Sequence, residues 1–270
     1  MMEGNYSKTE NYIIKIPEKC FEGTDEADRC CYTWKNLYIP YYLNKNIWKK
    51  FGKITLVRVG KGFGFWFGKD DDCCKISGDI VFNFGKGKKI PKYEYYEKLI
   101  IQDFSDNGKQ KNYYLNQLEK CWEANYSLNN CSLMPCTAGM NNFKGGLDLD
   151  RFDKYIYYMN QFFNNRNLDQ DIFSRAQARQ SKLGSAEENK NKLKITLFNF
   201  LNLFNDIYEY CEYMHLIDSK GYVDKLIESG EREIKSGKDV VRYMELAESY
   251  WKMKGERMKN TFKINTESLV

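Results

Sequence analysis

Polar side chains that could bind or transform a ligand gather in one segment near the middle of the chain. The six candidates are Asn141, Asn142, Lys144, Asp150, Arg151 and Asp153. Asparagine tolerates left-handed turns, and the Gly145-Gly146 pair lets the backbone approach a ligand closely. The two basic side chains could hold a phosphate beside the N-terminus of a following helix, and the carboxylates, with Asp148, could bind a divalent cation.

The same segment also has a purely structural interpretation. Its length and composition fit a buried loop, hydrogen-bonded within itself, that joins the two halves of the protein. Acidic residues at the start of a helix commonly serve to stabilise the helix dipole. Both interpretations of residues 141–153 therefore stay open at this point.

Several catalytic chemistries are excluded by residue types that the sequence lacks. His215 is the only histidine, which excludes histidine-rich zinc sites, HNH nucleases and most Ser–His–Asp hydrolases. It lies in a hydrophobic segment, so we expect a structural role for it. The outer glycines of residues 62–68 enclose five residues, whereas a Walker A loop needs four. We expect no cofactor and no bound metal, except a divalent metal if the protein is an enzyme.

Composition places the chain among globular proteins. It has 270 residues, of which 42% are hydrophobic, and it contains 21 Tyr, 17 Phe and 5 Trp, enough to bury a substantial core. No apolar run approaches the roughly 20 residues that span a membrane, and we see no secretory signal. Because the nine cysteines are odd in number, free thiols and a cytoplasmic location are expected. The abundance of Lys, Asn, Ile and Tyr suggests an AT-rich bacterial or phage genome, and a defence or mobile-element context.

Positive charge is concentrated in the first half of the chain. Residues 45–100 hold 13 Lys+Arg and 6 Asp+Glu, a net charge of +7, although the whole chain carries only +5. A basic region that also carries aromatic residues is typical of a nucleic-acid surface, and it also fits a solvated lysine-rich face. The residues that we expect to contact nucleic acid are Arg58, Lys61, Phe63 and Phe65.

The first 110 residues read as strands and turns. β-branched residues alternate over residues 54–59, and a Gly-Lys-Gly turn separates them from an aromatic run over residues 63–67. This pattern predicts a hairpin, and residues 78–84 predict a further strand. The segment from Tyr95 to Phe104 fits neither a strand nor a helix clearly.

The remainder of the chain reads as helices. Apolar residues at spacings of three and four predict helices over residues 112–125, from about residue 151 with Asp150 or Asp148 as N-cap, over 192–217 and near 240–258. The predicted fold class is therefore α+β, with an N-terminal antiparallel β-rich half packed on a C-terminal helical bundle. We place the boundary between residues 1–110 and 111–270, within one continuous domain.

Part of the basic half resembles an RNA-recognition motif. Leu37-Tyr-Ile39 is similar to one ribonucleoprotein box, and Lys61-Gly-Phe-Gly-Phe65 matches the first five positions of the other. The segment from Trp48 to Val59 is similar to the end of the first helix and the second strand of that motif. The resemblance implies that Tyr38, Phe63 and Phe65 stack on bases. Trp66 and Gly68 depart from the pattern of the motif.

A longer stretch, over roughly residues 34–217, resembles an uncharacterised bacterial domain family. The resemblance is carried by Ser77-Gly-Asp79, Asn130-Cys-Ser-Leu-Met-Pro135, Gly139-Met-Asn-Asn142-Phe-Lys-Gly145 and Asp150-Arg-Phe-Asp153. It implies a soluble bacterial α+β protein and carries no assigned activity.

Three functions remain under consideration. The first is a non-catalytic binding protein that contacts nucleic acid or a protein partner through its basic β half. The second is a metal-dependent enzyme that processes phosphodiesters or nucleotides, centred on residues 141–153. The third is a structural assembly subunit that docks through an aromatic surface. No membrane partner is expected, and the oligomeric state does not follow from the sequence.

Overall fold

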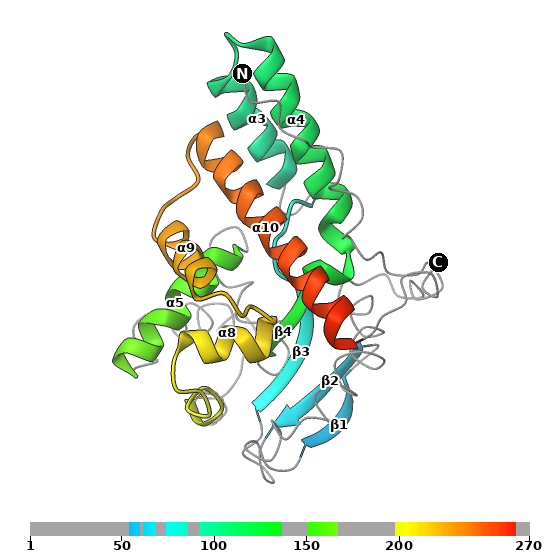
Figure 1. Cartoon of the computed structure of the whole chain (residues 1–270), viewed down its shortest axis with the longest axis vertical. Coiled ribbons are helices and arrows are strands. Elements are labelled where there is room, and N and C mark those ends of the chain that lie inside the picture. The colour runs from blue at the N-terminus through cyan, green and yellow to red at the C-terminus, as the bar shows by residue number, and fades with distance from the viewer. Residues whose placement is uncertain are drawn as a thin grey trace, which may run out of the picture.

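The computed structural model (Figure 1) describes residues 54–59, 62–67, 74–85, 92–136, 151–166 and 198–262. Within these ranges the chain is predominantly helical. The long helix α10 runs through the middle of the molecule, and a small sheet lies at one end of it (Figure 1).

The sheet has four antiparallel strands in the order β1-β2-β3-β4. The strands are β1 (Ile54–Val59), β2 (Gly62–Phe67), β3 (Cys74–Ile80) and β4 (Cys131–Cys136). The first two occupy the residues that the sequence pattern assigns to a hairpin, whereas β3 ends at Ile80, before the predicted limit at residue 84. In the register, Arg58 pairs with Phe63 across β1 and β2. β4 joins the sheet from much further along the chain.

The helices begin and end where local hydrogen bonds allow. They are α3 (Lys92–Asp103), α4 (Gly108–Glu123), α5 (Phe152–Asn165), α8 (Ile207–His215), α9 (Lys220–Gly230) and α10 (Gly237–Phe262), with two short 3-10 turns, η6 (Ala124–Tyr126) and η7 (Leu128–Asn130). The side chain of Asp206 accepts from Glu209 N at the start of α8, and that of Ser219 accepts from Tyr222 N at the start of α9, as N-caps do. α8 ends at His215, and its C-cap, Leu216, adopts a left-handed conformation with φ of 58°.

The predicted α+β fold class, with an N-terminal antiparallel β-rich half packed on a C-terminal helical bundle, is wrong, because the described residues are mostly helical. Helix α3 lies inside residues 1–110, and β4 lies inside residues 111–270 and pairs with β3. Two local predictions also fail. Arg151, not Asp150 or Asp148, is the N-cap of α5, and no side chain caps that helix. The helix expected over residues 192–217 is broken before α8, because the Asp206 carboxylate binds the free N–H of Glu209 and starts a new helix there.

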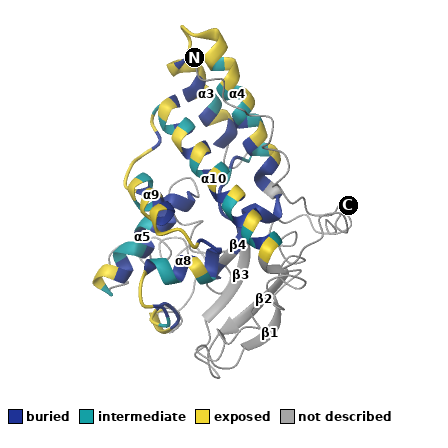
Figure 2. Ribbon diagram, viewed as in Figure 1, coloured by how far each residue is buried: buried dark blue, intermediate teal, exposed yellow. Residues whose placement is uncertain are grey.

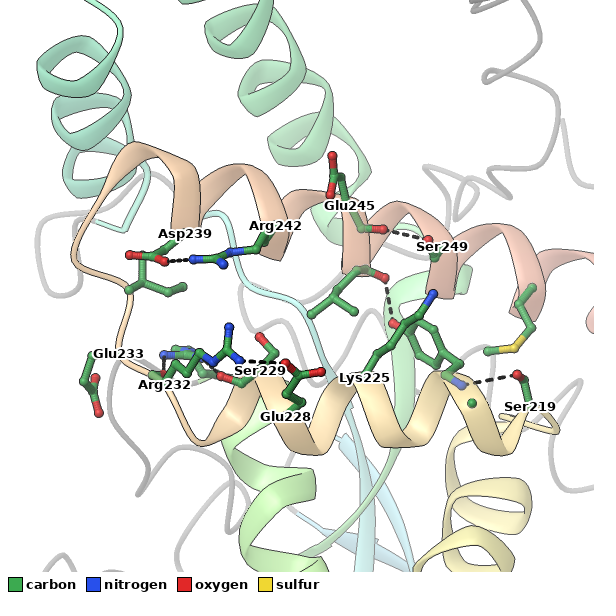
Figure 3. Close-up of a pocket in the computed structure, with 16 residues that line it drawn as sticks. Ser219, Lys225, Glu228, Ser229, Arg232, Glu233, Asp239, Arg242, Glu245 and Ser249 are labelled. Atoms are coloured by element: carbon green, nitrogen blue, oxygen red, sulfur yellow. Dashed lines mark hydrogen bonds and ion pairs between the residues drawn. The ribbon is translucent and has the colours of Figure 1, made fainter.

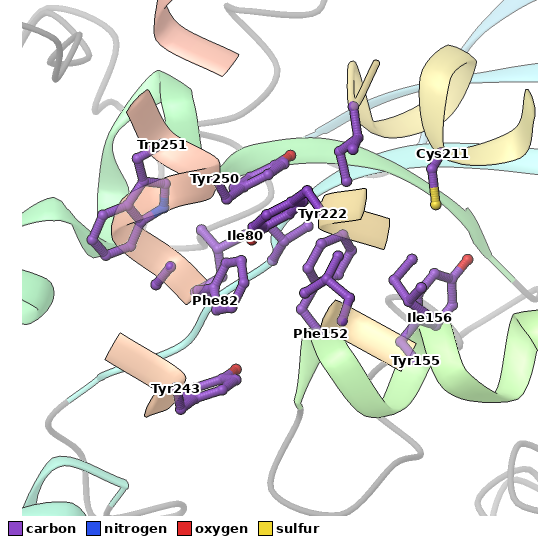
Figure 4. Close-up of a cluster of buried hydrophobic side chains, with 14 of the residues drawn as sticks. Ile80, Phe82, Phe152, Tyr155, Ile156, Cys211, Tyr222, Tyr243, Tyr250 and Trp251 are labelled. Carbon is purple, nitrogen blue, oxygen red and sulfur yellow. The ribbon is translucent and has the colours of Figure 1, made fainter. Parts of the chain in front are cut away.

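The core is built mainly from aromatic side chains that face α10. Buried residues line one side of α10 and of the helices around it (Figure 2). The ring of Phe82, which follows β3, lies 5.2 Å from Tyr243, 5.6 Å from Tyr250 and 6.4 Å from Trp251, centroid to centroid. These tilted and edge-to-face contacts (Figure 4) are the arrangements that aromatic pairs favour. The segment after β3 that carries Phe82 is therefore buried between the sheet and α10.

The side-chain amide of Asn130 holds this segment in place. Asn130 Oδ1 accepts from Phe82 N at 3.0 Å and from Trp251 Nε1 at 2.9 Å. Its Nδ2 donates to Phe82 O at 2.6 Å and to Asn125 O at 2.7 Å. The backbone oxygen of Asn130 accepts from Val81 N, so the side chain extends the pairing of β3 with β4 by one further step. Every donor and acceptor of the amide is used, which is the condition for burying it.

We expect Asn130→Asp to destabilise the protein more than Asn125→Asp. Asn125 uses its oxygen, which accepts from Phe84 N, while its buried Nδ2 has no hydrogen-bond partner among the described residues. Aspartate at 125 therefore keeps the useful contact, whereas aspartate at 130 loses two donors and sets a carboxylate against two carbonyls. At about 1–3 kcal/mol for each buried group left unsatisfied, the free energies of unfolding measured in urea should differ by about 2 kcal/mol or more. Equal losses in the two variants would contradict this role of the Asn130 amide.

Candidate functional site

Arg151 and Asp153, two of the predicted site residues, bind each other at the start of α5. The Arg151 backbone is extended, and this geometry turns its side chain back toward the first turn of the helix. Arg151 Nε donates to Asp153 Oδ1 at 2.9 Å, and Nη2 forms the second arm of the ion pair with Oδ2. Asp153 is 0% exposed and Arg151 is 2% exposed. The two-armed geometry is the strongest arrangement of a guanidinium and a carboxylate.

The Asp153 carboxylate is surrounded by protein donors. In addition to Arg151, it accepts from Ser229 Oγ at 2.7 Å and from the backbone N–H of Lys154 at 2.9 Å. A carboxylate offers about four lone-pair positions, and these four hydrogen bonds occupy them. Asp153 therefore has no position left for the divalent cation that the enzyme interpretation assigned to it.

The guanidinium of Arg151 also fastens the end of α9. It donates to Ser229 O at 3.0 Å and to Arg232 O at 2.7 Å, carbonyls at the C-terminus of a helix where positive charge is favoured. Burial alone would lower the pKa of Arg151, but the hydrogen bond and the charge of Asp153 raise it above its ordinary value. The guanidinium remains charged, and it joins α5 to α9.

The two helices approach each other too closely for a side chain to fit at their contact. A Cβ on Gly230, the last residue of α9, would lie 2.3 Å from Asp153 O and 2.7 Å from the Tyr157 Cβ. Because both are backbone or near-backbone atoms, they cannot move aside. Gly230 is therefore required for the α5–α9 contact that the Arg151–Asp153 pair secures.

A groove of about 730 Å³ lies between α9 and α10, and Arg151 of this ion pair borders it. Figure 3 shows the two helices side by side with charged side chains from both around the space between them. Arg151 lines the groove, together with residues of the helices and of the turn between them: Ser219, Gly221, Tyr222, Lys225, Glu228, Ser229, Arg232, Glu233, Ile234, Asp239, Arg242, Glu245, Leu246, Ser249 and Met253. This volume is in the range of small-molecule sites.

The charged residues of the groove differ in how firmly they are held. Asp239 lies in the first turn of α10, where its carboxylate accepts from Ser236 N and Ser236 Oγ. Burial raises the pKa of Asp239, but these hydrogen bonds and the pair with Arg242 outweigh it and hold the pKa below its ordinary value. Arg232, just after the end of α9, forms an exposed pair with Glu228 of that helix. The side chains of Lys225 and Glu245 are exposed and make no hydrogen bond or ion pair within the described part of the chain.

His215 is buried in the core, in the structural role expected for it. Its Nδ1 lies 2.8 Å from Ser132 Oγ, and the rings of Phe152 and Tyr210 lie 5.0 and 5.4 Å from its own. Nε2 has no hydrogen-bond partner among the described residues. Burial, and in second place the charge of Lys254, lower the pKa of His215 well below its ordinary value. The imidazole is thus held neutral.

Neither a metal cluster nor a membrane helix occurs in the described ranges. No group of three His, Cys, Asp or Glu residues there could hold a metal ion. Three cysteines in these ranges, Cys121, Cys131 and Cys211, are buried free thiols, and burial raises the pKa of Cys121 and Cys211. No described helix is both long enough and apolar enough to cross a membrane.

The predicted nucleic-acid residues lie on β1 and β2. Arg58 and Phe63 are paired across the two strands, and Leu56 pairs with Phe65. Directly opposed residues, and residues two apart on a strand, share one face of a sheet. The register therefore brings positions 58, 63 and 65 together on one face, which we call the hairpin face. Lys61 lies outside the described residues.

The other predicted polar residues are not placed. Asn141, Asn142, Lys144 and Asp150 lie outside the described ranges. The groove between α9 and α10, in contrast, was missed by sequence reasoning. Its charges have the helical spacing of any solvated helix surface, so the only available signal was that two charged helices, α9 and α10, follow each other closely.

Comparisons with protein-family models, with curated proteins and with solved structures find no match to this chain. The resemblances to an RNA-recognition motif and to an uncharacterised bacterial domain family therefore stay predictions.

We expect Asp153→Asn to destabilise the protein severely, because it leaves the Arg151 charge buried without its counter-ion. Breaking a buried pair in this way costs about 3–5 kcal/mol. The matched control is Glu228→Gln, which breaks an exposed pair at the C-terminal end of α9 and should cost about 1 kcal/mol at most. Urea unfolding at neutral pH measures both. A loss for Asp153→Asn no greater than that of the control would show that the buried pair does not secure α5 to α9.

We expect His215 to make the protein less stable as the pH falls below about 6.5, its unfolded pKa. Because the folded pKa is lower, the unfolded chain binds a proton that the folded protein rejects, at about 1.4 kcal/mol per pH unit. Stability curves from pH 7 to 5 should have a shallower slope in His215→Asn, which can keep a polar atom near Ser132. Identical slopes in the two proteins would exclude this contribution of His215.

Proposed function

We propose that the protein is a non-catalytic binding protein that contacts nucleic acid through the hairpin face. The observation that carries the proposal is the register of β1 and β2, which sets Arg58 opposite Phe63 and leaves Phe65 two positions along the same strand. An aromatic residue beside an arginine on one sheet face suits stacking on a base with contact to the neighbouring phosphate.

Charge supports the same partner. The hairpin lies inside residues 45–100, which carry a net charge of +7. Basic residues gain affinity for nucleic acid by releasing counter-ions from the phosphates, so this binding weakens steeply as salt rises. Lys61, which lies between the two strands in the sequence, adds a further positive charge to this segment.

The position of the hairpin in the fold also favours binding. β1 and β2 form one side of the sheet, and β4, at the opposite edge, contacts α8 (Figure 1). β3 is in turn paired with β4, and Asn130, just before β4, holds Phe82, just after β3. A binding surface mounted on a rigid support loses less conformational entropy when it takes up a ligand.

We expect the double variant Phe63→Ala/Phe65→Ala to weaken binding to single-stranded RNA or DNA by about 30-fold or more, since each stacked base contributes about 1–3 kcal/mol. Fluorescence anisotropy with labelled 20-residue oligonucleotides, at low and moderate salt, measures the affinity. The control is Trp66→Ala, because position 66 lies on the opposite face of β2. Its affinity should stay within a few-fold of the original, provided that thermal unfolding shows each variant to be folded.

Two outcomes would overturn the proposal. One is an unchanged affinity in the double variant, which would remove the hairpin face from the contact. The other is the absence of binding to any oligonucleotide at low salt, which would favour a protein partner for the basic surface instead.

A further inference from the structure

The groove between α9 and α10 combines an apolar floor with charged rims. Tyr222 and Ile234 are buried, 7% and 6% exposed, and still line it. Leu246 and Met253 are half-buried beside them. The Tyr222 hydroxyl donates to Leu246 O at 2.6 Å and so sets the spacing of the two helices. Such a floor suits a flat, weakly polar group, and the rims suit charged substituents on it.

Three cationic side chains on the rims are free to turn toward a ligand. The Lys225 side chain makes no hydrogen bond or ion pair within the described ranges. The pairs of Arg232 with Glu228 and of Arg242 with Asp239 leave both arginine side chains 56% exposed. Exposed pairs of this kind are worth about 0–1 kcal/mol. Asp239 does not depend on Arg242, because Ser236 and the backbone N–H of Lys235 also donate to it.

These cations are placed to meet more than one negative group. Lys225 lies on α9, and Arg232 lies in the turn just after Gly230, the last residue of α9, so the two side chains lie at different points along this wall of the groove. Arg242 belongs to the opposite wall. Arginine recognises phosphate oxygens with two parallel hydrogen bonds, and lysine adds a mobile charge.

The floor and the far rim supply hydrogen-bonding groups as well. Arg151 has five N–H groups, and its bonds to Asp153, Ser229 and Arg232 use four of them. One N–H on Nη1 is left over among the described residues, in a side chain that lines the groove. The exposed carboxylate of Glu245 can accept from a hydroxyl or an amino group.

We propose that this groove binds a small organic phosphate of nucleotide size, with the phosphates against Lys225, Arg232 and Arg242 and the organic part against Tyr222 and Leu246. The proposal is independent of the hairpin face, which lies on a different part of the molecule. Both halves of the ligand are needed, because neither the exposed cations nor the shallow apolar floor forms a tight site alone.

Isothermal titration of the full chain with AMP, ATP, adenosine and pyrophosphate tests the proposal. We expect AMP or ATP to bind at one site per chain. Adenosine lacks the phosphates and pyrophosphate lacks the organic part, so each should bind at least tenfold more weakly. Pyrophosphate binding as tightly as the nucleotides would overturn the proposal, and so would the absence of saturable nucleotide binding at millimolar concentration.

Variants then locate the binding in the groove. Lys225→Gln/Arg242→Gln should lower the nucleotide affinity at least tenfold, whereas Lys238→Gln/Lys252→Gln removes the same charge from exposed positions outside the groove and should change it less than twofold. Gly221→Leu is a second, steric test. Gly221 lines the groove, and a Cβ there would meet no atom within 4 Å, so a leucine should fill the groove without disturbing the fold.

The outcomes of these variants are distinct. Loss of affinity in both groove variants, with the surface control and Phe63→Ala/Phe65→Ala unchanged, supports the groove. Unchanged affinity in both groove variants overturns it, and a loss in the hairpin variant alone would assign the nucleotide to the hairpin face.

Discussion

The four hydrogen bonds of the Asn130 amide are the constraint on which the rest of the structure depends. They tie the backbone of Phe82 to the indole of Trp251 and to the turn that carries Asn125. The Phe82 ring can lie among Tyr243, Tyr250 and Trp251 only if the polar backbone beside it is satisfied. The aromatic ring can therefore be buried only if the peptide groups beside it are hydrogen-bonded, and Asn130 provides these hydrogen bonds. The sheet follows, because Asn130 directly precedes β4 and sets where β4 pairs with β3.

A second buried group, the Arg151 guanidinium, organises the other side of the molecule. It bridges the start of α5 and the end of α9, and α9 is one wall of the groove. One wall of the groove is thus positioned by an ion pair whose arginine lines the groove. This explains why residues that resemble an active site in the sequence have a structural role. An acid and a base two positions apart at a helix start can bind a ligand, but they can equally bind each other when burial removes competing water.

The sequence predicted those features that depend on local spacing. Apolar residues at intervals of three and four predicted most of α4, α5 and α10, and the aromatic hairpin was visible in the alternation of β1 and β2. β4 was not predicted, because Cys-Ser-Leu-Met-Pro-Cys shows no clear alternation and becomes a strand only by pairing with β3. The partners of Asp153 were equally hidden, since Ser229 lies 76 positions away. Long-range pairing of this kind is decided by packing, to which a single sequence gives no direct access.

Buried and exposed ion pairs have different roles in this protein: the buried pair stabilises the fold, and the exposed pairs can serve binding. Arg151 and Asp153 are withdrawn from water, so separating them would leave a charge in a medium that cannot solvate it. Arg232 and Arg242 lie about half in solvent, and Asp239, the partner of Arg242, keeps other hydrogen bonds, so moving these arginines costs little. Only exposed charges such as those of Arg232 and Arg242 can therefore leave their partners and pair with a ligand. The binding capacity of the α9–α10 region therefore comes from its least stabilising interactions, while the buried pair beneath keeps the walls in place as the rim side chains change partners.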